Sequence, residues 1–465
     1  MTGKRKRKLA MPDTLIIVAS VVLLVAILSW IIPSGTYDYQ EMNINGRIRN
    51  VAIDGTYHTI DKSEVTTTGF LGFFSVLYRG CVEAADVIFM ILCCCGTFGV
   101  VVKTGAFHAG IGTILKKLKG KEILLVPIIM MIFGLGGSVF GMASEFYGFY
   151  PLIVGLGVAL GYDAMFGFAI IAVGEFVGFM GATLNPYSVG IAQTISGVEL
   201  YSGTGYRAIC FVIFMAISII YVMVYGRKIK KNPGASVVFG EKNIHAFDRD
   251  ELNEYSFTLK DGLVLLDVLV VLVVLMLGLI KWGWDFPQLC GLFLLMSMIA
   301  AAICKWSPNK WCSEFIDSAK TAMWGCILTG IAKAITVVMQ DAQIMDTVIY
   351  GLSNVLKNAP HAVSAQVMLV VQTLINFFIP SATGQASATM PIMAQLADII
   401  GVSRQTAVLA FQFGDGLSNI FWPTADIVII CGLGGISLQK WYKWFTPLFL
   451  ILFVTQAILL GIATG

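Results

Sequence analysis

The sequence predicts an all-α polytopic membrane protein with two inverted repeats, each containing a re-entrant helical hairpin and a broken transmembrane helix. Three observations predict this fold. Hydrophobic residues make up 57% of the 465 residues and charged residues only 13%, whereas a soluble chain carries about 25% charged residues. The apolar runs are continuous rather than alternating, which excludes a β-barrel. Polar interruptions recur at matched places in the two halves of the chain.

Residues 1–79 are expected to contain one transmembrane helix, at about 13–33, and then an extracytoplasmic segment. The basic stretch "KRKRK" before this helix predicts a cytoplasmic N-terminus. The apolar run is longer than that of a signal peptide and lacks a small-residue cleavage site, so we expect the helix to be retained. The chain is therefore expected in the plasma (inner) membrane as a multi-pass protein.

Residues 80–226 form the predicted first repeat. A helix ending near Lys103 precedes an amphipathic segment expected at the membrane interface. The apolar region 122–160 is interrupted at "GLGGSVFGMASE", which predicts a hairpin, and 162–198 is interrupted at "GATLNPYS", which predicts a broken helix. A further helix, at about 206–226, completes this repeat.

The second half shows the same order of elements after a polar cytoplasmic linker and a pair of linking and scaffold helices. The expected segments are the linker at 227–260, the linking and scaffold helices at 261–316, and the second repeat at 317–465, with a helix at 313–339, an interfacial stretch at 340–360, a hairpin at 361–400, a broken helix at 404–436 and a last helix at 441–463. The whole chain then has about nine full spans plus two hairpins.

Small and polar residues at the interruptions align between the halves. Ser138, Gly141 and Ser144 align with Ser381, Gly384 and Ser387, and Glu175 aligns with Asp415. Basic residues concentrate in the segments that flank the first repeat, whereas the second counterpart of "KKLKGK" is slightly acidic. Because basic loops stay in the cytoplasm, the two repeats are predicted to have opposite orientations.

Irregular backbone in a membrane is tolerated only where it is buried in protein or lines a polar cavity. Interruptions at matched positions of two inverted halves are typical of secondary transporters, whose sites lie near the midplane at discontinuous helices. "PSATGQASATMP" is thus interpreted as a hairpin tip that faces a substrate. Helix N-termini there suit a carboxylate, and helix C-termini with hydroxyl groups suit Na⁺. Asn185 and Pro423 are expected to restart the helices after the breaks.

This reasoning selects two sets of site residues. The predicted substrate-binding residues are Ser138, Gly141, Ser144, Glu145, Asn185, Ser381, Thr383, Gly384, Ser387, Asn419, Thr424 and Asp426. The predicted ion-coupling residues are Glu175, Thr183, Asp415 and Ser418. Each also has a structural interpretation, since hydroxyl and amide groups join membrane helices and acids can cap helix ends.

Three stretches carry a resemblance to a known family: "GEFVGFMGATLNPYSVGIAQ", "IPSATGQASATMPIMAQLAD" and "FGDGLSNIFWPTADIVIICGLGGISL". Over nearly its whole length the chain resembles the YfcC-type carriers, grouped with the anaerobic C4-dicarboxylate carriers in the ion transporter superfamily. The resemblance implies inverted repeats, an elevator mechanism and often a homodimer. Relatives place Ser-Asn-Thr at both tips, whereas this chain has "SVFGMAS" and "SATGQAS", a departure from the motif that binds dicarboxylates.

Acids in the apolar regions help to choose among substrates, because such residues are costly and functional by default. A dicarboxylate site needs cationic groups, whereas this chain supplies acids, which suit a cationic group of the substrate. Amino acids are therefore expected first, in particular basic amino acids such as arginine and ornithine, or else small peptides, moved by exchange or by ion-coupled symport. The resemblance also points toward basic amino acid exchange. The alternative is a C4-dicarboxylate or related organic anion, coupled to Na⁺ or H⁺.

Other classes of protein fit the sequence less well. An enzyme would need a nucleophile with a base, or metal ligands, in one buried place, and the sequence groups no such residues. No metal and no cofactor are expected beyond Na⁺ or H⁺ as a coupling ion. The expected partners are a small-molecule substrate, the lipid bilayer and a second copy of the chain, with no nucleic acid. A channel would explain the re-entrant loops but not their pairing.

Overall fold

The computed structural model describes residues 14–44, 47–118, 122–241, 245, 257–357 and 363–464. This part of the chain is mostly helical, as predicted. The expected cytoplasmic flank before residue 14, the end of "KKLKGK", part of the 227–260 linker and the first two residues of the 361–400 hairpin lie outside the described residues.

Seven helices in the described part of the chain are long and apolar enough to cross a membrane. They are α1 (Thr14–Ile31), α3 (Ala85–Lys103), α9 (Thr204–Lys231), α11 (Leu259–Lys281), α12 (Phe286–Ile303), α14 (Met323–Asp341) and α20 (Leu438–Thr464). Their outward faces carry large apolar side chains: Leu24, Leu269 and Ile458 are 51%, 58% and 59% exposed. Rows of exposed aliphatic side chains are unfavourable in water, so these faces are suited to lipid.

Two further predicted spans are interrupted in the structure. Helix α7 (Ala164–Met180) continues after a non-helical stretch as the short α8 (Val189–Ile195), and α18 (Arg404–Ser418) continues likewise as α19 (Asp426–Gly434). We call residues 181–188 the first break and residues 419–425 the second break. Neither interrupted helix has a half long enough to cross a membrane alone, since each half falls short of about 20 residues.

A pair of helices packs on each interrupted helix. Helices α5 (Leu125–Leu135) and α6 (Phe149–Ala159) pack on α7, and α16 (Ser364–Phe378) and α17 (Ala382–Ile399) pack on α18. Residues 136–148, which join α5 to α6, are called the first tip. Residues 379–384, at the turn between α16 and α17, are called the second tip. Both tips fall within the stretches that the sequence marked as interruptions.

Two helices that were predicted as continuous are each split in the structure. The one ending near Lys103 consists of α2 (Phe70–Glu83) and α3, which meet at Ala84, and the one predicted at 313–339 consists of α13 (Pro308–Lys320) and α14. Their packing accounts for the splits, because α2 crosses α14 while α13 packs along α3. A Cβ added to Gly80 would lie 2.3 Å from the carbonyl oxygen of Gly330. Neither split has a proline or glycine signal at the joint.

The segment between α1 and α2 contains two small antiparallel ribbons that the all-α prediction omitted. Strand β1 (Ser34–Thr36) pairs with β4 (His58–Ile60), and β2 (Tyr39–Ile44) pairs with β3 (Arg47–Ala52). Asp346 on α15 (Met345–Lys357) accepts hydrogen bonds from the Tyr37 N–H at 3.0 Å and the Tyr39 hydroxyl at 2.8 Å. Strand β3 also packs against α17, so the ribbons lie against the helices of the second tip.

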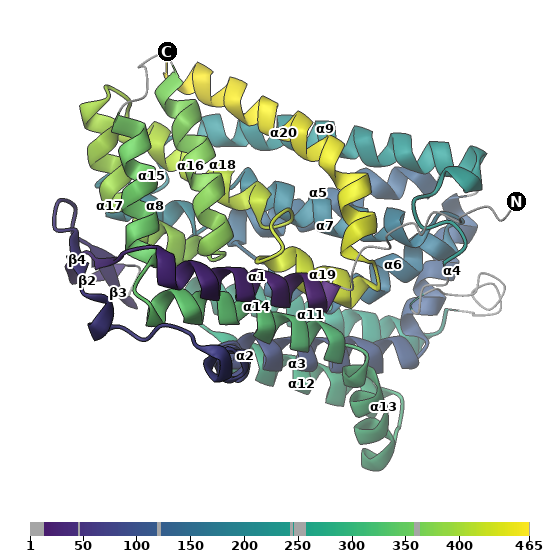
Figure 1. Ribbon diagram of the computed structural model, residues 1–465. Coiled ribbons are helices and arrows are strands. Elements are labelled where there is room, and N and C mark those ends of the chain that lie inside the picture. The colour runs from purple at the N-terminus through teal and green to yellow at the C-terminus, as the bar shows by residue number, and fades with distance from the viewer. Residues whose placement is uncertain are drawn as a thin grey trace, which may run out of the picture.

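The helices form two groups (Figure 1). One group contains α1, α2, α3, α12, α13 and α14, and the other contains the helices of the tips and breaks together with α9 and α20. Within the second group α7 packs directly on α18, so the two interrupted helices cross at its centre. The groups meet where α14 packs on α19 and where α3 reaches the first tip and α6.

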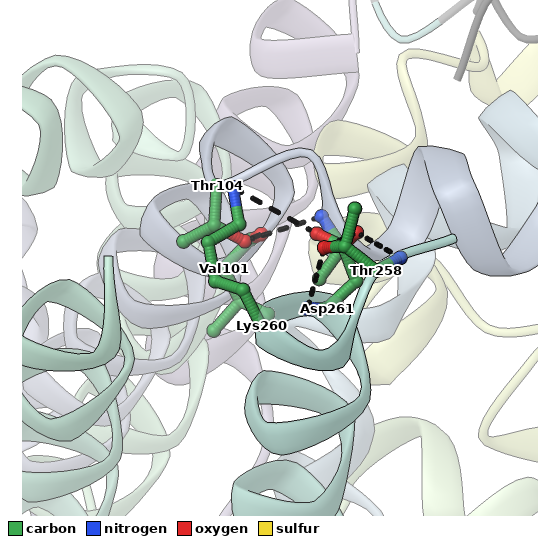
Figure 2. Close-up of polar contacts among 6 residues, drawn as sticks. Val101, Thr104, Thr258, Lys260 and Asp261 are labelled. Carbon is green, nitrogen blue, oxygen red and sulfur yellow. Dashed lines mark hydrogen bonds and ion pairs between the residues drawn. The ribbon is translucent and has the colours of Figure 1, made fainter. Parts of the chain in front are cut away.

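The linker region brings the two halves together at one end of the bundle. Figure 2 shows the start of α11, where Thr258 and Asp261 form a capping box: the Thr258 hydroxyl and N–H donate to Asp261 at 2.5 Å and 2.9 Å. Beside it, the Thr104 hydroxyl donates to the Val101 carbonyl at 2.6 Å at the end of α3. Reciprocal capping satisfies N–H groups that a helix start leaves free, so the linker ends where α11 begins.

Candidate functional site

The first tip is bound to the first break by hydrogen bonds on both sides. The Ser138 hydroxyl donates to the Gly181 carbonyl at 3.0 Å and lies 3.1 Å from the Thr183 hydroxyl. The Thr183 N–H donates to the Ser138 carbonyl at 2.9 Å. These bonds satisfy backbone groups that the unwound segment would otherwise leave unpaired, as burial requires.

Gly141 ends the π-helical turn at Gly136–Phe140 and can only be glycine there. Its φ is +69°, and a Cβ would lie 2.4 Å from the Asn185 Oδ1. Asn185 also donates from Nδ2 to the Gly137 carbonyl at 3.4 Å. Asn185 and Gly141 therefore determine how closely the first tip approaches the first break. Ser144 begins a short 3₁₀ turn after the tip and is half-buried.

The two expected helix starts are placed later in the chain than predicted. Asn185 Oδ1 accepts from the N–H groups of Tyr187 at 2.9 Å and Ser188 at 3.2 Å, which closes a turn before α8 begins at Val189. Pro423 lies in the turns of the second break, and α19 begins only at Asp426. Short polar side chains can stabilise such turns as well as helix starts, which is why the pattern was ambiguous.

The second tip reaches across to the first break. Ser381 is the N-cap of α17 and accepts from the Gly384 N–H at 3.3 Å. The Thr383 hydroxyl donates to the Tyr187 carbonyl at 2.9 Å, whereas the Ser387 hydroxyl donates back to the Thr383 carbonyl at 2.8 Å. Thr383 thus joins the two halves, while Ser387 bonds within its own helix.

The second break is held against the end of α16. The Thr424 hydroxyl donates to the Phe377 carbonyl at 2.7 Å, and the Trp422 indole N–H donates to the Thr373 carbonyl at 2.7 Å. Within the break, the Ile427 N–H donates to the Asn419 carbonyl at 3.0 Å. The Ser418 hydroxyl donates to the Asp415 carbonyl at 3.2 Å, and so it stabilises the end of α18.

Four predicted acids converge between the tips and the breaks. Glu145, Glu175 and Asp415 are 8%, 0% and 0% exposed, and Asp426 is half-buried. Asp426 lies close enough to interact electrostatically with both Glu175 and Asp415, and Glu145 does so with Glu175. No Lys or Arg forms an ion pair with these four carboxyl groups within the part of the chain that the structure describes.

Two tyrosines that the sequence interpretation did not select hold these acids. The Tyr147 hydroxyl donates to Asp426 Oδ1 at 2.8 Å, and the Tyr150 hydroxyl donates to Glu175 Oε2 at 2.8 Å. Glu145 Oε2 accepts from the Ala143 N–H at 3.0 Å. Both tyrosines follow the first tip in "EFYGFY", where aromatic residues are read as core because nothing in one sequence shows what their hydroxyls reach.

Amides and one arginine were also missed. Asn376 donates to Asp415 Oδ1 at 3.0 Å, and Gln385 lies beside it on α17. Their signal was present, because an Asn inside the apolar "QVMLVVQTLINFFI" needs a polar partner. Arg207 on α9 is 2% exposed, and its guanidinium donates to the carbonyls of Ser202 and Thr183 at 2.7 Å and 3.0 Å. Its position at a helix start resembled an end that reaches the membrane surface.

Comparisons with known proteins place this geometry among carriers. The family model described as "C4-dicarboxylate anaerobic carrier" matches residues 11–465. YfcC of Escherichia coli strain K12, provisionally named a basic amino acid antiporter, is 32% identical over 98% of this chain and 97% of its own. An uncharacterised protein of Haemophilus influenzae strain Rd is 28% identical over 98% of both chains.

Solved transporter structures align along almost the whole chain at low similarity. The YdaH transporter of Alcanivorax borkumensis has a TM-score of 0.44 and 14% identity, with 97% of this chain and 98% of that chain covered. MtrF of Neisseria gonorrhoeae, which belongs to a class of antimetabolite efflux pumps, has a TM-score of 0.43 and 15% identity, with 98% and 96% covered.

Proposed function

We propose, from the premise that this chain belongs to the C4-dicarboxylate anaerobic carrier family, that it is a secondary transporter of basic amino acids such as arginine and ornithine in the plasma membrane. One observation carries the choice of substrate. Glu145, Glu175, Asp415 and Asp426 gather around the breaks without an ion-pair partner among the described residues. Buried charges need a partner, and a guanidinium or ammonium group of the substrate supplies one.

The substrate carboxylate would bind at a different place from its side chain. The N-terminus of α17, capped by Ser381, carries the partial positive charge of a helix start and lies beside the first break through Thr383. The acids Glu145 and Asp426 lie on the side of Tyr147. An amino acid with a cationic side chain carries one group for each of these two environments. The name of the E. coli relative supports the same substrate class.

We further propose that the chain consists of inverted repeats with re-entrant hairpins and works as an elevator. Reciprocal packing supports the repeats, since α2 packs on α14 as α13 packs on α3, and each helix pair packs on its own interrupted helix. The division into two helix groups supports movement of the tips and breaks past the other group. Transport by exchange or by ion-coupled symport, the cytoplasmic N-terminus and a homodimer belong to the same proposal.

A C4-dicarboxylate or related anion is the second candidate. Arg207 favours it, because a buried guanidinium beside the first break could attract a carboxylate. Its N–H groups, however, donate to carbonyl groups of the protein, and the acids nearby would repel a dianion. The balance of charge therefore favours a cationic amino acid.

Uptake by proteoliposomes tests the proposal. Vesicles preloaded with ornithine, arginine, succinate or buffer would receive labelled arginine, with and without a Na⁺ gradient. We expect uptake driven by internal ornithine or arginine, and loss of this uptake in Asp426→Asn and Glu145→Gln. The matched control is Asp317→Asn, which alters an exposed acid on α13 that pairs with Lys320. Entry of labelled succinate without arginine uptake would instead establish the anion carrier.

A further inference from the structure

The amide cluster beside Asp415 contains more hydrogen-bond acceptors than donors. Asn376 Nδ2 lies 3.0 Å from Asp415 Oδ1, 3.1 Å from Asn419 Oδ1 and 3.2 Å from Gln385 Oε1. An amide NH₂ group has two hydrogens, so one of these three oxygens receives none. Asp415 Oδ2 and Asn376 Oδ1 are also buried without a partner among the described residues.

The neighbouring side chains do not remove this excess. Gln385 Nε2 donates to the Gln372 carbonyl at 2.9 Å and to its Oε1 at 2.7 Å, and so it faces away from Asp415. Asn376, Gln385 and Asp415 are all 0% exposed and Asn419 is 4% exposed. Turning the Asn376 amide over would aim its oxygen at three other oxygens. A buried oxygen without a donor costs about 1–3 kcal/mol, which leaves several such costs in one place.

We propose that Asp415, Asn376, Asn419 and Gln385 bind one Na⁺ ion, which is the coupling ion of the proposed transport function. A hard cation takes carboxylate and amide oxygens as ligands and satisfies several of them at once. A proton on Asp415 would satisfy only one further acceptor. The site lies at the C-terminal end of α18, where Asn419 is the C-cap, and the partial negative charge of that helix end also favours a cation.

The equivalent position of the first half lacks this set of ligands. Glu175, which aligns with Asp415, accepts from the Tyr150 hydroxyl at 2.8 Å and is likewise 0% exposed. A phenol hydroxyl occupied in this way supplies a donor rather than a cluster of amide oxygens. The structure therefore favours one Na⁺ site for each chain, and Glu175→Gln is a matched control that removes an equally buried acid.

Equilibrium binding of labelled ²²Na⁺ to the purified full-length protein tests this inference without any transport substrate. We expect saturable binding that choline does not compete for, with one ion for each chain. Asp415→Asn should weaken binding by about tenfold or more, corresponding to about 1.4 kcal/mol, whereas Glu175→Gln should bind as the unchanged protein does. Asn419→Ala provides a second ligand variant should Asp415→Asn fail to fold.

Each outcome separates this inference from the proposed function. Absence of saturable Na⁺ binding, or equal binding by Asp415→Asn and the unchanged protein, would overturn the Na⁺ site even if arginine exchange were observed. Saturable binding lost in Asp415→Asn would support the site even if the transported substrate proved to be succinate. Protection that follows pH and not Na⁺ would replace the ion by a proton and overturn the proposal.

Discussion

Tyr147 connects the two halves of the candidate site through one hydroxyl group. It belongs to the first tip, yet its hydroxyl donates to Asp426 at the start of α19. The tyrosine is 2% exposed, so water does not readily replace this hydrogen bond. A carboxylate that loses its donor in such a place bears the full cost of burial. Tyr147 thus orients Asp426 for any cationic group that enters between the tips.

Removal of this hydroxyl is the residue-scale prediction. We expect Tyr147→Phe to keep the fold, because the ring stays packed, and to lower the arginine exchange rate by about tenfold, since roughly 1–3 kcal/mol of hydrogen bonding is lost. Tyr221→Phe is the matched control, because that hydroxyl donates to the Trp444 carbonyl at 2.9 Å away from the acids. Equal rates for both variants in proteoliposomes would remove Tyr147 from the site.

The elements around the site are held together backbone to backbone by glycines. A Cβ on Gly416 of α18 would lie 2.4 Å from the Cα of Met180 on α7. At the same crossing, the Gln412 amide donates to the Phe179 carbonyl at 2.7 Å. Close approach at small residues is the usual way in which helices associate inside a membrane. The crossing of α7 and α18 therefore determines the distance between the first and second breaks.

The element-scale prediction widens this crossing. Gly416→Ala should lower the unfolding temperature of the detergent-purified protein, because the added methyl group meets backbone atoms that cannot move separately and overpacking costs about 1–3 kcal/mol. Gly291→Ala on α12 is the control, since a Cβ there has nothing within 4 Å. Alanine in place of that helical glycine should leave the stability unchanged or raise it. A temperature for Gly416→Ala equal to that of the control would contradict the crossing.

At the scale of the whole molecule, the contact between the two helix groups is made of small residues. A Cβ on Gly432 of α19 would lie 3.1 Å from the Cα of Gly325 on α14. Few side chains interlock at such a surface, so one group can slide past the other at low cost. This contact supports the elevator proposal in a way that the composition of either helix alone does not.

A cross-link across this contact is the corresponding prediction. Cysteines at both positions should form a disulfide, because the Cβ atoms would lie near the range of about 3.5–4.5 Å that the bond requires. In a Cys326→Ala, Cys431→Ala background, oxidation of Gly325→Cys/Gly432→Cys should stop arginine exchange, and a reducing agent should restore it. Single-cysteine variants should be insensitive to the oxidant. Unchanged exchange by protein that mass spectrometry shows to be cross-linked would exclude sliding at this contact.

Sequence reasoning was sufficient for features that depend on local composition. Continuous apolar runs predict helices in a membrane, because lipid leaves the backbone no other partner. Runs of Gly, Ser and Pro predicted where helices stop, and the structure interrupts them at "GATLNPYS" and "SNIFWPTAD". The acids were identifiable one by one, since an ionisable group in an apolar run is rare.

Tertiary structure decided what these features meet. The splits at Ala84 and between α13 and α14 arise from helices that cross far apart in sequence, so no residue at the joint announces them. The roles of Tyr147 and Asn376 depend on partners 279 and 39 residues away. A sequence states which groups must be satisfied when they are buried, whereas only the folded chain determines which distant group satisfies them and which oxygens are left for an ion.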